Sequence, residues 1–152
     1  MITRYTFIII GGIDMDNIQL VVGELVTWLK DKVHNAGAKG LVFGLSGGVD
    51  SAVLAGGSKL VFPDTSLGII MPCHSNIMDI EHALLVAKAL GLDTDIVDLT
   101  TTFDTMLKSF RLNDNKLAIA NIKPRLRMTT LYYYAQNLNY LVAGGSNKSE
   151  FT

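Results

Sequence analysis

The chain has 152 residues, of which 49% are hydrophobic and 18% are charged, so it can form one domain with a buried core and does not resemble a disordered segment. Its 13 Lys and Arg residues against 14 Asp and Glu residues give a formal net charge of −1, which excludes a general positive field that would attract nucleic acid or an acidic membrane. The single cysteine, Cys73, excludes an internal disulfide and favours a cytoplasmic location.

We do not expect the apolar run near the start of the chain to be a membrane anchor. The apolar run at residues 7–13 is too short to span a bilayer, and no small-residue cleavage site follows it. We interpret residues 1–14 as a leader of uncertain origin and residues 15–152 as a single domain. Apolar residues at helical spacing then predict an amphipathic surface helix over residues 17–34.

Strands and helices are expected to alternate along the rest of the chain. Apolar runs predict strands at residues 40–45, 66–72, 95–99 and 140–145. Between them, helical spacing predicts helices at residues 51–61, 76–90, 101–110 and 116–121, and a longer helix with Pro124 in its first turn. Asn76 is the expected N-cap of the helix at residues 76–90, and Gly91 is its expected end. Two helix faces are expected to be buried, one with Ile80, Ala83, Leu84, Ala87 and Leu90, the other with Met128, Leu131, Tyr132, Ala135 and Leu138.

This alternation predicts an α/β fold with a doubly wound parallel sheet, helices on both faces and three layers. Ligands bind to such sheets beyond the carboxyl ends of the strands, where the strand order reverses. The loops that follow the first, second and fourth predicted core strands should therefore lie at one edge and meet one ligand.

The most informative stretch is "GLSGGVDS" at residues 44–51, directly after a buried strand. Glycines allow main-chain N–H groups to converge on an anion at a helix N-terminus, and Ser46 and Ser51 add hydroxyl donors. Asp50 cannot bind phosphate directly and is better explained as a ligand for the Mg²⁺ that accompanies a nucleotide. The alternative is a tight turn with a plain helix cap. The stretch is neither the usual nucleoside-triphosphatase loop nor the dinucleotide fingerprint.

"SGGVDS" resembles the pyrophosphate-binding motif of ATP pyrophosphatases, which adenylate a substrate and release pyrophosphate. That motif alone leaves GMP synthetase, asparagine synthetase and tRNA-thiolating enzymes open. Three further stretches, "FPDTSLGIIMPC", "NIKPRLRMTTLYYYAQ" and "LVAGGSNKSE", closely resemble the ammonia-dependent NAD synthetase family, and the resemblance extends from about Met15 to the last residue.

The resemblance implies a site for two substrates, ATP and deamido-NAD, and for Mg²⁺. Arg125 would contact deamido-NAD, while Asp50 and Glu150 would hold the metal ion. In the implied reaction the carboxylate of deamido-NAD attacks the α-phosphate of ATP, and ammonia then displaces AMP to give NAD. No residue is assigned as a general base or other catalytic group. The implied ATP-binding residues are Gly44, Leu45, Ser46, Gly47, Gly48, Val49, Asp50, Ser51, Met71 and Gly145.

Other charged and aromatic residues have simpler expected roles. Lys123 and Arg127 share a helix face opposite Arg125, and we expect them in a solvated or intersubunit salt bridge. The three consecutive tyrosines 132–134 cannot all face one core, so one is expected to meet a partner chain, in line with the homodimers of the family. His34, His74 and His82 are expected at the surface, and Cys73 as a packed thiol.

Two departures from the family pattern leave alternatives open. The family domain continues well past the "NKSE" turn, so the resemblance implies a C-terminally truncated, N-terminal portion of that domain. Gly145 also stands where the family usually has a threonine that contacts ATP. The alternatives to an NAD synthetase are a nucleotide-binding remnant without turnover and a related ATP pyrophosphatase with another acceptor.

Overall fold

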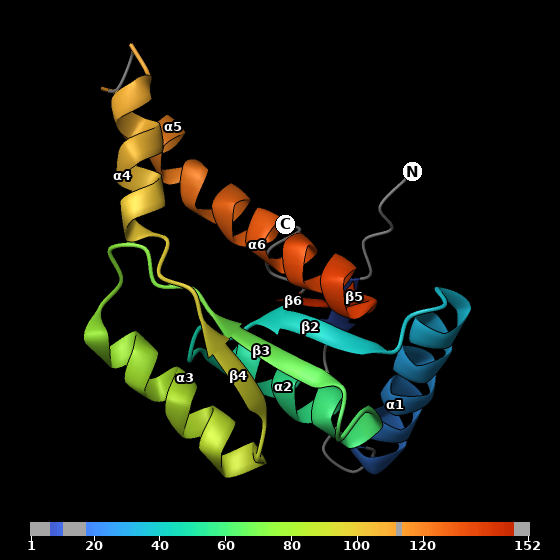
Figure 1. Ribbon diagram of the computed structural model, residues 1–152. Helices are drawn as coiled ribbons and strands as arrows, with labels where there is room; N and C mark the ends of the chain where they lie inside the picture. The colour runs from blue at the N-terminus through green and yellow to red at the C-terminus, as the bar shows by residue number, and fades with distance from the viewer. Residues whose placement is uncertain (1–6, 11–17, 112–113, 148–152) are drawn as a thin grey trace.

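The computed structural model describes residues 7–10, 18–111 and 114–147 (Figure 1). The helices and strands, in chain order, are β1 (Phe7–Ile10), α1 (Ile18–Asn35), β2 (Gly40–Gly44), α2 (Val49–Val61), β3 (Ser66–Ile70), α3 (Ile77–Leu90), β4 (Asp93–Ile96), α4 (Thr100–Ser109), α5 (Lys116–Ala120), α6 (Ile122–Leu138), β5 (Tyr140–Val142) and β6 (Gly144–Asn147).

The central sheet has four parallel strands in the order β4-β3-β2-β5. The chain adds β3 and β4 on one side of β2 and later returns to add β5 on the other side. Strand order therefore reverses between β2 and β5, which is the doubly wound arrangement that the sequence predicts. Because all four strands are parallel, the loops after β2, β3 and β5 leave the same edge of the sheet.

Helices cover both faces of this sheet, so the predicted three layers are confirmed (Figure 1). Successive residues of a strand point to opposite faces. Leu41 and Phe43 of β2 accordingly pack with α1, α2 and α3, whereas Val42 packs with α4 and α6. All three side chains have 0% exposure, so β2 is the centre of both halves of the core.

The predicted ends of α3 are confirmed. The side chain of Asn76 accepts a hydrogen bond from the main chain of the first helical turn at 3.1 Å. Gly91 ends the helix with a left-handed φ of +57°, which costs glycine little because it has no Cβ. Pro124 lies in the first turn of α6, as predicted.

Two leucines that were expected to face the sheet are exposed instead. Leu84 of α3 is 41% exposed, because Ala83 and Ala87 occupy the buried face and the next residue is rotated by about 100° around the helix axis. Leu138 is 39% exposed, because it is the last residue of α6 and lies beyond the buried part of that helix at Leu131 and Ala135.

The edge strand β4 differs in its position from the predicted strand at 95–99. It begins at Asp93 and ends at Ile96. An edge strand has a neighbour on one side only, so its apolar residues need not be buried, and Ile96 is 50% exposed. The main-chain N–H of Val97 still donates to the carbonyl oxygen of Ile70 at 2.9 Å, so the chain stays beside β3 past the end of β4.

The predicted fourth strand is divided in two at Ala143. β5 pairs with β2, and β6 pairs in parallel with β1 in a separate two-stranded sheet, with Phe7 opposite Gly144. The sequence did not predict this pairing, because it joins the two ends of the described chain. The division into a leader at 1–14 and a domain from 15 onwards stays a prediction.

No helix in the described ranges has the length and apolar character needed to cross a bilayer.

Two buried serines, one on α2 and one on β3, allow the contribution of a buried hydroxyl to the free energy of unfolding to be compared with and without a hydrogen bond. The hydroxyl of Ser66 lies 2.9 Å from the carbonyl oxygen of Ser58 and 2.8 Å from that of Phe62, whereas the buried hydroxyl of Ser58 has no hydrogen-bond partner. We predict that Ser58→Ala leaves the free energy of unfolding unchanged or raises it by about 1 kcal/mol, and that Ser66→Ala lowers it by about 1 to 2 kcal/mol. Urea denaturation of both variants checks this, and a larger loss for Ser58→Ala would contradict it.

A tyrosine of α6 links that helix to the edge strand. Tyr134 donates a hydrogen bond to the Asp95 carboxylate, and this bond, with partial burial, raises the pKa of the phenol to about 12. Because the pKa is higher in the folded than in the unfolded chain, this stabilisation is fully present below about pH 10 and is lost as the pH rises towards 12. We therefore expect the stability difference between the wild type and Tyr134→Phe to be largest up to pH 10 and to shrink above it. Urea denaturation from pH 8 to 11.5 measures this, with Tyr133→Phe as the control; a constant difference would refute it.

Candidate nucleotide site at the carboxyl edge of the sheet

The glycine loop, residues 44–51, runs from the end of β2 into the first turn of α2. Ser51 Oγ lies 2.8 Å from Gly48 O, 3.1 Å from Ser46 Oγ and 3.2 Å from Ser46 N. α2 begins at Val49, two residues earlier than predicted, so Asp50 lies within the first turn rather than at the cap. The N-cap is Gly48, which has no capping side chain. The N–H groups of the first turn therefore stay available for an anion.

Gly47 holds this loop close to α3. Its φ is +81°, which strains any residue with a Cβ. A Cβ at this position would lie 2.7 Å from the carbonyl oxygen of Asp79 and 2.8 Å from Cβ of His82. Gly48 lies in the extended region, and the nearest atom to an added Cβ is Ser46 Oγ at 3.5 Å. The neighbouring atoms therefore exclude a side chain at Gly47 but not at Gly48.

Two cavities flank the glycine loop, and both include Gly44 and Ser46. The first has a volume of about 310 Å³, and its other lining residues are Leu45, Ile69, Ile70, Met71, Pro72, Ser75, Asp79, Ile80 and Arg127. The second has a volume of about 280 Å³, and its other lining residues are Asp50, Ser51, Leu54, Met128, Leu131, Tyr132, Val142, Ala143, Gly144 and Gly145.

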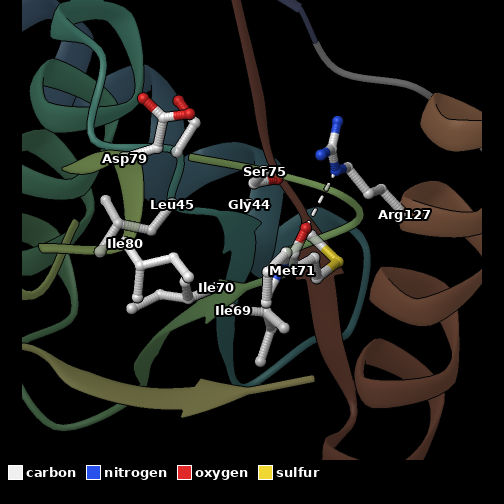
Figure 2. A pocket seen from close by; sticks show the side chains of 11 residues that line it. Gly44, Leu45, Ile69, Ile70, Met71, Ser75, Asp79, Ile80 and Arg127 are labelled. Carbon is white, nitrogen blue, oxygen red and sulfur yellow. Dashed lines mark hydrogen bonds between the residues drawn. The ribbon is translucent and has the colours of Figure 1, made fainter. Parts of the chain in front are cut away.

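The first cavity has an apolar floor and a polar rim (Figure 2). Ile69, Ile70 and Met71 form part of the floor, and all three are buried. Figure 2 shows Asp79 and Arg127 on opposite sides of this floor, one from α3 and one from α6. An apolar surface with polar groups at its edges suits a flat heterocycle such as a nucleobase.

The structure brings most of the predicted ATP residues together. Met71 lines the first cavity, and Asp50, Ser51 and Gly145 line the second. Two loop residues contribute differently, because Leu45 is a buried core residue and Val49 is 78% exposed. Their side chains do not define the loop, although their main-chain groups belong to it.

Arg125 and Arg127 of α6 lie differently relative to the two cavities. Arg125 lines neither cavity, and its Nη1 donates to the carbonyl oxygen of Asn121 at 2.7 Å, so its contact with deamido-NAD stays a prediction. Arg127 was expected in a solvated or intersubunit salt bridge. It is instead half-buried at the first cavity, where its Nε donates to the carbonyl oxygen of Met71 at 3.2 Å. Lys123, which was expected to share a helix face with Arg127, has its Nζ over the Phe103 ring, 5.4 Å from the ring centroid.

Sequence reasoning also missed Ser75 and Asp79 as lining residues of the first cavity. A signal was present, since both lie in the turn after β3 or the first turn of α3, at the edge where ligands were expected. Tyr132 was expected to pack inward and does so, because it is half-buried at the second cavity. Tyr133 is 68% exposed, and its contact with a partner chain remains a prediction.

A metal ion would have one predicted carboxylate ligand in the described region. Asp50 is exposed and borders the second cavity, whereas Glu150 lies outside the described residues. Within the described ranges, no group of three or more His, Cys, Asp or Glu side chains could hold a metal ion. Asp50 nevertheless fits Mg²⁺, because this ion is usually bound by one or two carboxylates together with substrate phosphates.

The loop after β3 is also joined to α4. His74 has a φ of +50°, and its Nε2 lies 2.7 Å from the carboxylate of Asp104. The histidine is exposed, as expected, but it is not an isolated surface residue. The adjacent Cys73 is a packed thiol, as predicted, and burial raises its pKa although the Lys123 and Arg127 cations act in the opposite direction.

The space at Gly145 would accept a side chain. An added Cβ would lie 3.6 Å from the carbonyl oxygen of Asp50, which is ordinary contact. The surrounding space therefore does not require a glycine here. The hydroxyl of the threonine that the family usually has at this position is absent for another reason than crowding.

A doubly wound parallel sheet with a glycine loop at its strand-order reversal, and with two cavities beside that loop, is typical of nucleotide-binding α/β proteins. The NAD synthase family model matches residues 21–152. The chain belongs to the NAD synthase family.

Known relatives agree with this assignment. The NH(3)-dependent NAD(+) synthetase of Finegoldia magna is 52% identical over 128 residues, covering 84% of this chain and 53% of the relative. That of Carboxydothermus hydrogenoformans is 53% identical over 131 residues, covering 84% and 54%. The chain thus spans about half the length of the curated relatives that it matches.

Solved structures show the same fold. The NH3-dependent NAD synthetase of Campylobacter jejuni matches with a TM-score of 0.82 and 34% identity, covering 88% of this chain and 58% of that chain. The NMN synthetase of Francisella tularensis matches with a TM-score of 0.83 and 31% identity, covering 88% and 56%.

The two glycines of the loop allow a direct test of its geometry. We predict that Gly47→Ala lowers the free energy of unfolding by about 1 to 3 kcal/mol and weakens ATP binding, because it combines a strained φ with contact against the α3 main chain. Gly48→Ala should change stability by less than about 1 kcal/mol. Thermal unfolding with and without ATP measures both effects. Equal stability of the two variants would show that the close approach of the loop to α3 is not required.

Proposed function

We propose that this chain forms the nucleotide-binding part of an ammonia-dependent NAD synthetase. The observation that carries this proposal is the glycine loop, which is held by hydrogen bonds of its serine hydroxyls and lies between two cavities. The chain that contains this loop is more than half identical to NH(3)-dependent NAD(+) synthetases over most of its length. The substrates would be ATP, deamido-NAD and ammonia, and the products NAD, AMP and pyrophosphate.

The proposed reaction has two steps. The nicotinate carboxylate of deamido-NAD attacks the α-phosphorus of ATP, an oxygen–phosphorus bond forms, and pyrophosphate leaves. Ammonia then attacks the acyl carbon of the adenylate and displaces AMP, with loss of a proton to solvent. Because adenylation converts a poor leaving group into a good one, the protein contributes mainly by positioning and by stabilising charge.

Each predicted residue has a proposed part in this reaction. The main-chain N–H groups of the glycine loop and the hydroxyls of Ser46 and Ser51 would bind the phosphates, while the cavity at Met71 would take the adenine. Asp50, with Glu150, would hold Mg²⁺, and this ion when bound supplies positive charge that balances the phosphate charge. Arg125 would contact deamido-NAD.

We also propose that the protein forms a homodimer in the cytoplasm. Tyr133 and Leu117, on α6 and α5, are 68% and 73% exposed, and large apolar or aromatic side chains of this kind are enriched at protein interfaces. Neither nucleic acid nor a membrane is a proposed partner, because the net charge is only −1.

One finding favours a second candidate. Gly145 has no side chain beside the second cavity, at the position where the family usually has a threonine that contacts ATP. A protein that binds ATP without turnover would account for this difference. The structural match to an NMN synthetase also makes a mononucleotide acceptor worth testing.

The assay combines ATP, Mg²⁺, ammonium and deamido-NAD and measures NAD. We expect NAD formation by the wild-type chain to exceed that of Ser46→Ala and Asp50→Ala by at least about tenfold, the effect of losing one charge-assisted contact. ATP binding without any NAD would reject the synthetase in favour of binding alone. Nicotinate mononucleotide as acceptor, with NMN as the measured product, tests the other acceptor.

A further inference from the structure

Arg127 is a cation at the nucleotide cavity with no acidic partner in the described part of the chain. Its side chain is half-buried, and the ion pair found among the described residues joins His74 and Asp104 instead. Asp79, the carboxylate that lines the same cavity, lies on the opposite side of it (Figure 2). A partly buried charge without a counter-charge costs free energy, so this position favours an anionic ligand.

The hydrogen bonding of Arg127 leaves its outer end available. Its Nε donates to the carbonyl oxygen of Met71 at 3.2 Å, and this bond fixes the direction of the side chain (Figure 2). Among the described residues, neither Nη atom of Arg127 makes a hydrogen bond. Guanidinium has five N–H donors in a planar fork, so four remain that match the oxygens of a phosphate group.

The position of Arg127 along α6 indicates which phosphate it would meet. Gly44 and Ser46 line both cavities, so the two cavities meet at the start of the glycine loop. Arg127 lines the first cavity and the next residue, Met128, lines the second, so α6 passes the same junction from the other side. With a base in the first cavity and a phosphate tail on the loop, the α-phosphate lies at this junction.

We propose that the guanidinium of Arg127 binds the α-phosphate of the nucleotide and stabilises the negative charge on that group while the acceptor carboxylate attacks it. This inference rests on the proposed function for the identity of the nucleotide. In this step the carboxylate oxygen forms a bond to the α-phosphorus, and the bond from that phosphorus to the bridging oxygen of pyrophosphate breaks. Arg127 neither gives nor takes a proton and acts through its charge and its hydrogen bonds.

The test compares adenosine and AMP, which differ only by the α-phosphate, as ligands of the purified chain in isothermal titration calorimetry. Arg127→Gln keeps an N–H donor but removes the charge, and we expect it to weaken AMP binding by about tenfold or more while adenosine binding changes less than twofold. Arg111→Gln is the matched control, because Arg111 is exposed and lines neither cavity. It should leave both affinities unchanged.

The other outcomes separate this inference from the proposed function. If Arg127→Gln binds AMP as tightly as the wild type does, the inference is wrong although the nucleotide site stands. If adenosine and AMP weaken equally, Arg127 supports the base or the cavity wall, and the inference is again wrong. A wild-type chain that binds no adenine nucleotide overturns the inference together with the proposed function.

A second variant decides the matter if Arg127→Gln folds poorly. Arg127→Lys keeps the positive charge, so it should bind AMP more tightly than Arg127→Gln and more weakly than the wild type, with adenosine affinity unchanged. A lysine variant with wild-type folding and wild-type AMP affinity at all salt concentrations would show that the planar fork of the guanidinium makes no contact of its own with the phosphate, and would overturn the proposal. Thermal unfolding of each variant without ligand identifies any that fold poorly.

Discussion

The close approach of the glycine loop to α3 is the constraint on which the site depends. A Cβ at Gly47 would come within 2.7 Å of the main chain of α3, so the loop can lie there only with a bare residue in a left-handed conformation. This contact places Ser46 and the start of α2 at the edge of the sheet. The serine hydroxyls then hold the turn in shape, and the N–H groups of the first turn of α2 remain available.

α6 connects the two cavities and therefore determines the shape of the site. The helix packs on the sheet through Leu131 and Ala135, which are both buried. This packing turns Arg127 towards the first cavity and Met128 and Tyr132 towards the second. One helix thus forms a wall of both cavities, and the hydrogen bond from Arg127 to Met71 joins that wall to the end of β3.

The family assignment explains the architecture of the chain, whereas the activity of the relatives applies to this chain only as a proposal. Membership of the NAD synthase family accounts for the loop, the sheet and the cavities, all of which lie within the matched residues 21–152. The relatives are about twice as long as the matched segment, so their activity comes to this chain as a proposal. The proposed binding of the nucleotide uses the glycine loop and the two cavities beside it, which lie within the described residues.

The sequence by itself determined the alternation of strands and helices, the caps of α3 and the edge of the sheet at which the two cavities lie. These features are local or periodic: Asn76 and Gly91 act within one turn of the helix, and the glycine loop directly follows a buried strand. Only the tertiary structure decided which arginine meets the cavity. Helical spacing separates Arg125 from Arg127 by face, but the face that turns towards the sheet depends on how α6 packs. The same reason explains the shifted edge strand and the pairing of β6 with β1, since strand partners that are distant in the sequence are selected by packing and leave no local pattern.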